Sequence, residues 1–374
     1  MKIWSPLLAT LVLLNSFSAQ IFQDDEINIE VIDDDVDLNI VAESDNYPCN
    51  GYPQYRKLPV NQGFYLGAQN AGSQVFKGEC QASQDASIIK MLEDGIRFLD
   101  VNLCTNEKNI VVVCSNRDST VSSTPFTDVL NEAFIFAREN PEQFFIINLR
   151  SENVGHQANI KDLEQQMDTI CKTHTELTPG TDEYVKYKCP FIYRHEKGPW
   201  PSIGELVNYN PEMAQWEGDG ELVGVRTKML FTASESISTV PEYQPSYFTE
   251  PFWRESRASE PNKLKDNLKK VCRVPAGGIK LNAYADDACS KDDYSPEQIE
   301  DLLLDKLGCN LNDSPLNTFI SVLSVNHYGK HLRYLQELKD RMMEINYAKW
   351  NGNYQLVRPS TIATKQHKVQ RDEL

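Results

Sequence analysis

The residues Met91-Leu92-Glu93-Asp94-Gly95-Ile96-Arg97-Phe98-Leu99-Asp100 lead from a predicted helix into a predicted strand. The helix is indicated over residues 83–94, where Ile88, Ile89 and Leu92 recur at helical spacing, and Gly95 stands where a helix would end. Residues 96–103 are rich in β-forming residues, which predicts a strand directly after the glycine.

The same alternation of strand and helix extends in both directions along the chain. Strands are predicted at 64–68, 110–114, 144–149, 228–233 and 318–325, and helices at 124–140, 262–271, 296–307 and 331–345. Residues 175–227 and 235–257 are rich in Pro, Gly, Tyr and Trp, and we expect them to be long ordered loops over one face. Alternating strands and helices predict a parallel sheet with crossover helices, and 374 residues suit one α/β barrel domain with appendages.

Both ends of the chain carry targeting signals. Residues 1–20 have a basic start, an apolar run over 7–14 and small residues at 16, 18 and 19, which is the order of a signal peptide. The chain ends in Arg371, Asp372, Glu373 and Leu374, one basic exchange away from the tetrapeptides read by the receptor that retrieves proteins to the endoplasmic reticulum. We therefore expect a protein of the reticulum lumen with this receptor as a partner, and no transmembrane segment.

The net charge of −17 is concentrated near the amino end. Ten acidic residues precede Arg56, the first basic residue after the predicted signal peptide: Asp24, Asp25, Glu26, Glu30, Asp33, Asp34, Asp35, Asp37, Glu43 and Asp45. Such a block is typical of a disordered, solvated segment, which we place at 21–46; weak calcium binding or a propeptide role stays open. The acidic balance argues against nucleic acid and anionic membrane surfaces as partners.

Nine cysteines fit an oxidising compartment, and their odd number leaves at least one thiol outside any disulfide within the chain. Cys104 and Cys114 flank a short turn and are candidates to bridge two strands. Cys171 with Cys189, and Cys272 with Cys289 or Cys309, are further candidates, because connectivity does not follow from sequence.

Several short motifs, in this order, carry a resemblance to a known family. They are Leu66-Gly67-Ala68-Gln69-Asn70, the stretch Met91–Asp100, Val111-Val112-Val113-Cys114, Thr124-Pro125-Phe126-Thr127-Asp128-Val129-Leu130, Asn140-Pro141 and, later, Trp200-Pro201-Ser202-Ile203-Gly204-Glu205-Leu206. From about Phe64 to Arg150 the chain resembles the phosphatidylinositol-specific phospholipase C X-domain superfamily of PLC-like phosphodiesterases. The resemblance implies a TIM-barrel-like (β/α)8 fold with long loops over the carboxyl-terminal face, spanning 47–357 and followed by a tail, 358–374.

In that family two histidines act as general base and general acid on a phosphodiester. The resemblance places them after the first strand and after the third, where this chain has Gln69 and Ser115. An amide cannot act as a base and a hydroxyl is a much weaker acid than imidazolium, and each such group contributes roughly 10²- to 10⁴-fold to rate. The substitutions therefore predict a pseudoenzyme.

The family's cation site is altered as well. Asn70 and Asp100 stand at positions that bind calcium in the eukaryotic enzymes, but two further acids of that site are replaced by Asn102 and Arg150. Because calcium prefers several oxygen ligands with net negative charge, we expect no calcium and no other cofactor. Arg150 instead suits an anion such as a phosphate.

Three functions stay open on these residues. The first is a degenerate barrel in which Gln69, Asn70, Arg97, Asn102 and Ser115 contact a phosphate-bearing ligand, lipid headgroup, glycan or client protein. The second is a phosphoric diester hydrolase of lipid metabolism with relocated acid and base, for which the candidate catalytic residues are Asp100, Arg150 and His327, with His195 as a substitute for His327. The third is a lumenal chaperone or calcium buffer acting through 21–46.

Two structural roles compete with ligand contact for the retained residues. Asp100 and Arg97 could pair as a structural ion pair at the barrel mouth. Asn70 could serve only to cap a turn. No zinc spacing, phosphate-cradling glycine loop or serine-hydrolase motif is found in the sequence, so no metal ligands are assigned.

Overall fold

The computed structural model describes residues 49–76, 82–115, 121–152, 156–176, 189, 191–207, 214–216, 222–224, 227–258, 261–271, 277–283, 294–304 and 318–351. The chain divides into two compact units, 1–43 and 44–374, and every described residue lies in the second. The predicted signal peptide, the acidic segment and the retrieval tetrapeptide lie outside the described residues.

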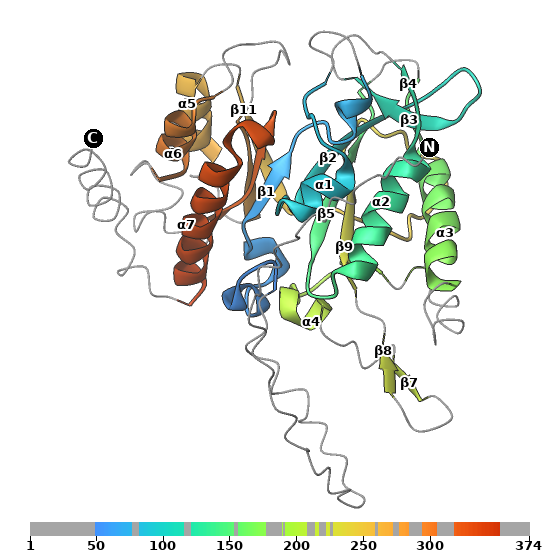
Figure 1. Cartoon of the computed structure of the whole chain (residues 1–374), viewed down its shortest axis with the longest axis horizontal. Coiled ribbons are helices and arrows are strands. Elements are labelled where there is room, and N and C mark those ends of the chain that lie inside the picture. The colour runs from blue at the N-terminus through green and yellow to red at the C-terminus, as the bar shows by residue number, and fades with distance from the viewer. Residues whose placement is uncertain are drawn as a thin grey trace, which may run out of the picture. The chain divides into compact units, whose positions relative to one another are not determined.

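A curled parallel sheet forms the centre of this second unit (Figure 1). Its strands follow one another in the order β10 (Phe248–Thr249), β9 (Met229–Ala233), β5 (Phe145–Arg150), β2 (Phe98–Thr105), β1 (Tyr65–Ala68), β13 (Thr318–Val325), β12 (Gly277–Ala283) and β11 (Trp253–Arg257). A further short strand, β6 (Ile192–Tyr193), pairs with β9 in parallel. The two ends of this path, β10 and β11, are separated in the chain by only residues 250–252, so a short connection joins them. The predicted TIM-barrel-like arrangement is confirmed as a mixed α/β fold with a curled parallel sheet.

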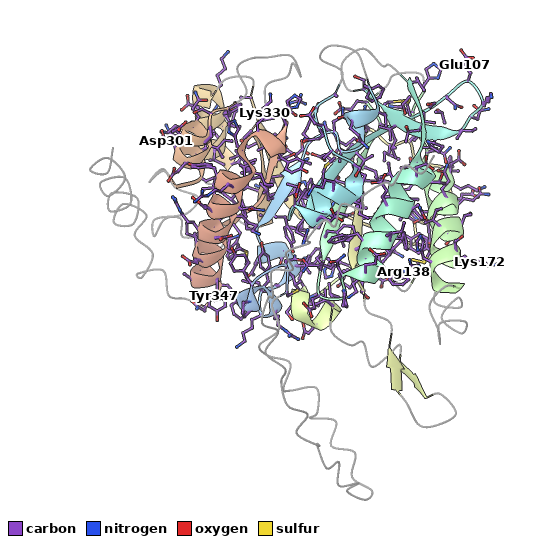
Figure 2. All side chains as sticks on the ribbon, viewed as in Figure 1. Glu107, Arg138, Lys172, Asp301, Lys330 and Tyr347 are labelled. Atoms are coloured by element: carbon purple, nitrogen blue, oxygen red, sulfur yellow. A yellow bond between two sulfur atoms is a disulfide. The ribbon has the colours of Figure 1, made fainter. Side chains whose placement is uncertain are left out.

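The sheet strands are apolar enough to be buried on both faces. Every residue of β1 and β5 is buried, and so is every residue of β2 up to Cys104. Strands of this kind are typical of parallel sheets covered by helices. At the far end of β2 an antiparallel extension, β3 (Val111–Cys114) and β4 (Val121–Pro125), continues the pairing, and Figure 2 shows Glu107 in the turn between β2 and β3.

Helices follow most strands and pack in two groups outside the sheet. In one group α1 (Ile88–Glu93) contacts α2 (Phe126–Glu139), which contacts α3 (Ile160–Glu176); in the other α5 (Pro261–Val271) contacts α6 (Pro296–Leu304), which contacts α7 (Leu332–Trp350). Ser87 caps α1 by accepting a hydrogen bond from the Lys90 backbone N–H at 3.3 Å. Figure 2 shows Lys330 and Tyr347 near opposite ends of α7.

The helix α2 illustrates why these segments form where they do. Its apolar residues recur every three or four positions and are all buried: Phe126, Val129, Leu130, Ala133, Phe134, Phe136 and Ala137. Asp128 lies in the first turn and Arg138 in the last, which suits the helix dipole at both ends. The predicted helix at 124–140 is thus confirmed, with its first turn beginning after Pro125.

The two regions predicted as long loops contain regular structure. The first holds β6, α4 (Ile203–Val207), β7 (Ala214–Trp216) and β8 (Leu222–Gly224); the second holds β10 and β11. Residues 253–257 are therefore a strand of the sheet, and the prediction of a loop there was wrong because the polar residues 254–257 are typical of a loop when read without their pairing to β12. The bridge between Ser202 and Pro59, which precedes β1, places part of the first region at the amino ends of the strands.

Two disulfides stabilise this framework. Cys104 on β2 is bonded to Cys114 on β3, and Cys171 on α3 is bonded to Cys189, as two of the candidate pairings predicted. Among the described cysteines, Cys49 forms no disulfide; it is buried, and burial raises the pKa of its thiol to about 12. The remaining candidate pairings, Cys272 with Cys289 or Cys309, lie outside the described residues.

Within the described part of the chain, no helix has both the length and the apolar character needed to cross a membrane.

Candidate functional site

Polar side chains from neighbouring strands line up inside the curled sheet. Asp100 on β2 lies in register with Asn148 on β5, and Asn148 lies in register with Thr232 on β9. The Thr232 hydroxyl donates to Oδ1 of Asn148 at 2.7 Å, and Nδ2 of Asn148 donates to Oδ1 of Asp100 at 2.6 Å. All three residues are buried, and their side chains form one continuous hydrogen-bonded row.

Lys280 completes this row from β12. Its Nζ lies 2.6 Å from Oδ2 of Asp100 and 2.9 Å from Oε1 of Glu255 on β11. The hydroxyl of Ser324 on β13 also donates to Oδ2 of Asp100, at 3.4 Å. We call the six residues Asp100, Asn148, Thr232, Glu255, Lys280 and Ser324 the inner polar layer. They come from six different strands, so the layer exists only in the folded sheet.

A β-bulge directs Lys280 into the layer. The register between β12 and β13 shifts between Ile279 and Lys280, so that Lys280 lies opposite Val322 and one residue of β13 is left over. Bulges of this kind re-aim a side chain and are common beside functional sites. The lysine ammonium also lies 5.1 Å from the centre of the Phe98 ring, which in turn packs edge-on against Trp253.

The layer sets the ionisation of Asp100. Burial by itself would raise the pKa of this carboxyl, but the Lys280 ammonium and the Arg150 guanidinium outweigh it, with further help from the Asn148 hydrogen bond. The pKa of Asp100 therefore lies below its usual range, and the carboxyl is ionised at neutral pH.

Gln69 and Asn70 lie where β1 ends. The Gln69 N–H donates to the Val325 carbonyl at 3.0 Å, and the Gln69 carbonyl accepts from Nε2 of Gln84 at 2.9 Å. Asn70 has a left-handed backbone with φ of 50° and is 2% exposed, yet neither polar atom of its side chain has a hydrogen-bond partner among the described residues. The side chain therefore does not cap a turn here, and a buried amide without partners is costly unless a ligand or water meets it.

Asn102 lies within β2, in register with Arg150 at the end of β5, and it contacts Ser115, which directly follows β3. Nδ2 of Asn102 donates to the carbonyls of Cys114 at 3.2 Å and Ser115 at 3.3 Å, and its Oδ1 accepts from the Glu152 N–H at 3.3 Å. Arg150 is paired with the carboxylate of Glu152. The Asn102 amide thus ties three segments together, and its polar atoms are already used within the protein.

Arg97 is the predicted ligand-binding residue that the structure places elsewhere. It precedes β2, and its fully buried guanidinium donates to the carbonyls of Leu92 at 2.6 Å and Ile96 at 2.8 Å and to Oε1 of Gln143. Burial lowers the pKa of Arg97 to about 10. The expected ion pair of Asp100 with Arg97 is corrected: the ion-pair partner of Asp100 is Lys280, because Arg97 lies at the amino end of the strand and Asp100 two residues inside it.

Neither candidate histidine hydrogen-bonds with Asp100 or Arg150. His327 follows β13 with a left-handed backbone, and its Nδ1 lies 3.2 Å from Oδ2 of Asp85. His195 stacks on Trp200 with ring centres 3.8 Å apart, and its Nδ1 meets the hydroxyl of Tyr193 at 2.9 Å. These two imidazoles are engaged with residues that lie outside the inner polar layer.

Sequence reasoning missed five members of the inner polar layer: Asn148, Thr232, Glu255, Lys280 and Ser324. A signal was present for two of them, because Asn148 interrupts the apolar run 144–149 and Lys280 stands between Ile279 and Leu281. A polar residue inside a strand that is otherwise apolar indicates a buried partner. The partners themselves come from strands far apart in sequence.

The donor set at this end of the sheet differs from that of a calcium site. Calcium takes six to eight oxygen ligands, whereas here an ammonium lies on Asp100, a guanidinium lies beside Glu152 and the Asn102 amide is committed to the backbone. Among the described residues, no cluster of three or more His, Cys, Asp or Glu side chains is arranged to hold a metal ion.

Two comparisons with known proteins find similarities to this chain. The sequence model of the family "Phosphatidylinositol-specific phospholipase C, X domain" matches residues 71–184. Among solved structures, the phosphatidylinositol-specific phospholipase C of Listeria monocytogenes is similar at 10% identity and a TM-score of 0.47, covering 77% of this chain and 97% of that one. A variant of the Staphylococcus aureus enzyme is similar at 10% identity and a TM-score of 0.44, covering 73% and 89%.

A comparison with curated protein sequences finds no match. The two structural likenesses are too distant to assign an activity. The sequence match spans α1, the hairpin β3–β4, the strands β2 and β5 that carry Asp100, Asn102 and Arg150, and Ser115, which directly follows β3. Residues 71–184, which are less than half of the chain, are accordingly similar to the X domain of phosphatidylinositol-specific phospholipase C.

Proposed function

We propose that this chain is a phospholipase C-like barrel that binds a polar ligand at the carboxyl ends of its strands and does not hydrolyse phosphodiesters. The observation that carries the proposal is the pair Gln69 and Ser115 at the positions where the family resemblance implies two imidazoles. Neither side chain exchanges a proton at neutral pH, so the reaction would lack both its general base and its general acid.

The two candidate replacement histidines support the same conclusion. His327 is engaged with Asp85, and His195 with Tyr193 and Trp200, whereas the hydrogen bonds of the Asp100 side chain go to other members of the inner polar layer. A general base must reach the proton it removes directly or through one water. An active hydrolase with a relocated imidazole would therefore require His195 or His327 to change partners.

The ligand that suits this site is rich in hydroxyl groups. Arg150 and Lys280 already face carboxylates, so an anion would compete with Glu152, Asp100 and Glu255. Hydrogen-bonding capacity remains instead on amides: both polar atoms of Asn70 and Oδ1 of Asn282 have no partner among the described residues. Planar amides of this kind donate and accept at once, as a sugar or polyol headgroup requires.

The test compares turnover and binding on the same purified protein. We expect no release of product from phosphatidylinositol or from glycerophosphodiesters, and we expect heat on titration with myo-inositol, an inositol phosphate or a neutral oligosaccharide. Asn70→Gly removes the amide while keeping a residue that tolerates the left-handed backbone, and it should weaken binding at least tenfold. Asn267→Ala on α5 is the matched control and should leave affinity unchanged.

Turnover that is abolished by Arg150→Ala would overturn the non-catalytic part of the proposal. Equal affinity of the wild type and Asn70→Gly would overturn the assignment of the ligand to the end of β1.

We further propose that the protein works in the lumen of the endoplasmic reticulum. Residues 1–20 support entry into the secretory pathway, and Arg371–Leu374 support retrieval by the tetrapeptide receptor. Deleting residues 371–374 should release the protein into the culture medium, whereas the full chain should stay inside the cell. Equal secretion of both forms would contradict this assignment.

A further inference from the structure

The ammonium of Lys280 is enclosed by the protein. Its side chain is 0% exposed, and it lies between the carboxylates of Asp100, which is 1% exposed, and Glu255, which is 43% exposed. The ammonium also lies over the face of the Phe98 ring, 5.1 Å from its centre. If the Lys280 side chain moved away, the buried carboxylate of Asp100 would lose its ion-pair partner, which is strongly unfavourable.

The sheet geometry fixes this contact in place. The bulge before Lys280 sets the direction of its side chain, and Asp100 is held from its other oxygen by Nδ2 of Asn148. Both partners are therefore positioned by backbone pairing and not by flexible loops. The Lys280 side chain is therefore held at this point by the strands themselves.

We propose that the Lys280 ammonium is the resident cation of the inner polar layer and that it keeps divalent metal ions away from Asp100. A divalent ion that bound Asp100 would face a buried ammonium within a few ångströms, and this repulsion adds to the poor fit of Asn102 and Arg150 as ligands. The proposal is independent of whether the barrel binds a ligand or hydrolyses one.

Removing the ammonium should expose an oxygen-rich set on three strands. Asp100 and Glu255 contribute carboxylate oxygens and Asn282 contributes its amide oxygen, and Nδ2 of Asn282 already lies 3.4 Å from Oε2 of Glu255. Lys280→Ala removes the charge and leaves space for an ion. The variant should gain calcium binding that the wild type lacks.

The experiment uses the full mature chain and calcium alone as the probe. The melting temperature in excess calcium and in chelator is compared for the wild type, Asp100→Asn, Lys280→Ala and Lys280→Ala/Asp100→Asn. Calorimetric titration gives the stoichiometry. The acidic segment 21–46 can bind calcium weakly and add a background signal. The calcium response of the wild type is therefore compared with that of Asp100→Asn, and the response of Lys280→Ala with that of the double variant.

The wild type and Asp100→Asn should respond equally to calcium. The melting temperature of Lys280→Ala should be several degrees higher in excess calcium than in chelator, and titration should show one calcium site. The double variant should show neither the rise nor the site. A calcium site in the wild type that Asp100→Asn removes would overturn the proposal. A folded Lys280→Ala without any gain would also overturn it, and if Lys280→Ala fails to fold, the wild-type comparison decides.

Discussion

Asp100 and Lys280 come from strands that are three positions apart in the sheet, yet their charged atoms lie 2.6 Å from each other. Neighbouring strands are about 4.8 Å apart, so in a flat sheet β2 and β12 would be separated by roughly 14 Å. The two side chains meet because β1 and β13, which lie between them, curl the sheet around its interior. The ion pair is thus both a product of the curvature and a tie that holds it.

Removing only one member of this pair should be costly. Lys280→Met keeps most of the side-chain volume but leaves the buried carboxylate of Asp100 without its cation, and we expect a loss of about 3–5 kcal/mol in the free energy of unfolding. Adding Asp100→Asn should recover part of the loss, because the uncompensated charge is gone. Urea denaturation of the two single variants and the double variant measures the coupling energy. A Lys280→Met variant within 0.5 kcal/mol of the wild type would show that the pair is not buried as described.

The lowered pKa of Asp100 predicts how stability responds to acid. A carboxyl whose pKa is depressed in the folded state contributes stability above its unfolded pKa of about 3.9, and that contribution is lost as the pH falls through the folded pKa. The melting temperature of Asp100→Asn should therefore be lower than that of the wild type at pH 6. The difference between the two melting temperatures should become smaller in strong acid. Thermal denaturation between pH 2 and pH 6 measures this, with the exposed residue Asp301 changed to Asn as a control. A gap that is constant with pH would contradict the assigned shift.

The disulfide between Cys104 and Cys114 should stabilise both the fold and the site. It closes a loop with a sequence separation of 10, for which chain entropy predicts a contribution of roughly 2–3 kcal/mol. Because Nδ2 of Asn102 bonds to the Cys114 carbonyl, the double variant Cys104→Ser/Cys114→Ser should also loosen the segment that carries Ser115. Melting temperature and ligand affinity are both measured.

The matched control for that variant is Cys171→Ser/Cys189→Ser. This disulfide spans a separation of 18 and attaches to α3, so it should cost similar stability. Affinity should fall only in the variant that lacks the Cys104–Cys114 bond. An equal fall in both variants would point to a general loss of folding.

Gly204 on α4 should not tolerate a side chain. A Cβ added there would lie 2.7 Å from the Arg56 carbonyl oxygen and 2.9 Å from the Arg56 Cβ, and the carbonyl is backbone that cannot easily move. Gly204→Ala should reduce the free energy of unfolding by about 1–3 kcal/mol. Gly329→Ala is the control, since nothing lies within 4 Å of its Cβ position, and it should stay within about 0.5 kcal/mol of the wild type. Chemical denaturation distinguishes them, and similar values for both would contradict the close packing of α4 on η2 (Pro53–Arg56).

Local sequence patterns were enough to predict the helices and strands that first indicated the fold. The strand 318–325 is confirmed residue for residue, and the helix at 262–271 begins one residue earlier than expected. The predicted helix at 83–94 is shorter, because Ser87 caps it and α1 starts at Ile88. Ends of elements depend on caps and tertiary contacts more than on periodicity.

The strand 253–257 was missed for a physical reason. Only Trp253 and Ser256 are buried in it, so the two-residue periodicity of a strand is absent, and its polar sequence is typical of a loop when read alone. Its partner, β12, was not expected either. Only pairing between the two shows that Glu255 lies beside Lys280.

By itself the sequence determined the alternation of strands and helices and two correct disulfide candidates. The targeting signals at both ends, and the interpretation that Gln69 and Ser115 replace two imidazoles, stay predictions from the sequence. These features depend on residue type and short spacing. Tertiary structure alone decided that Asp100 pairs with Lys280 and not with Arg97, and that Asn70 keeps an unpartnered amide. Within the inner polar layer, Ser324 and Asp100 are 224 positions apart in the chain, and such contacts are set by the curvature and register of the sheet, which no local pattern encodes.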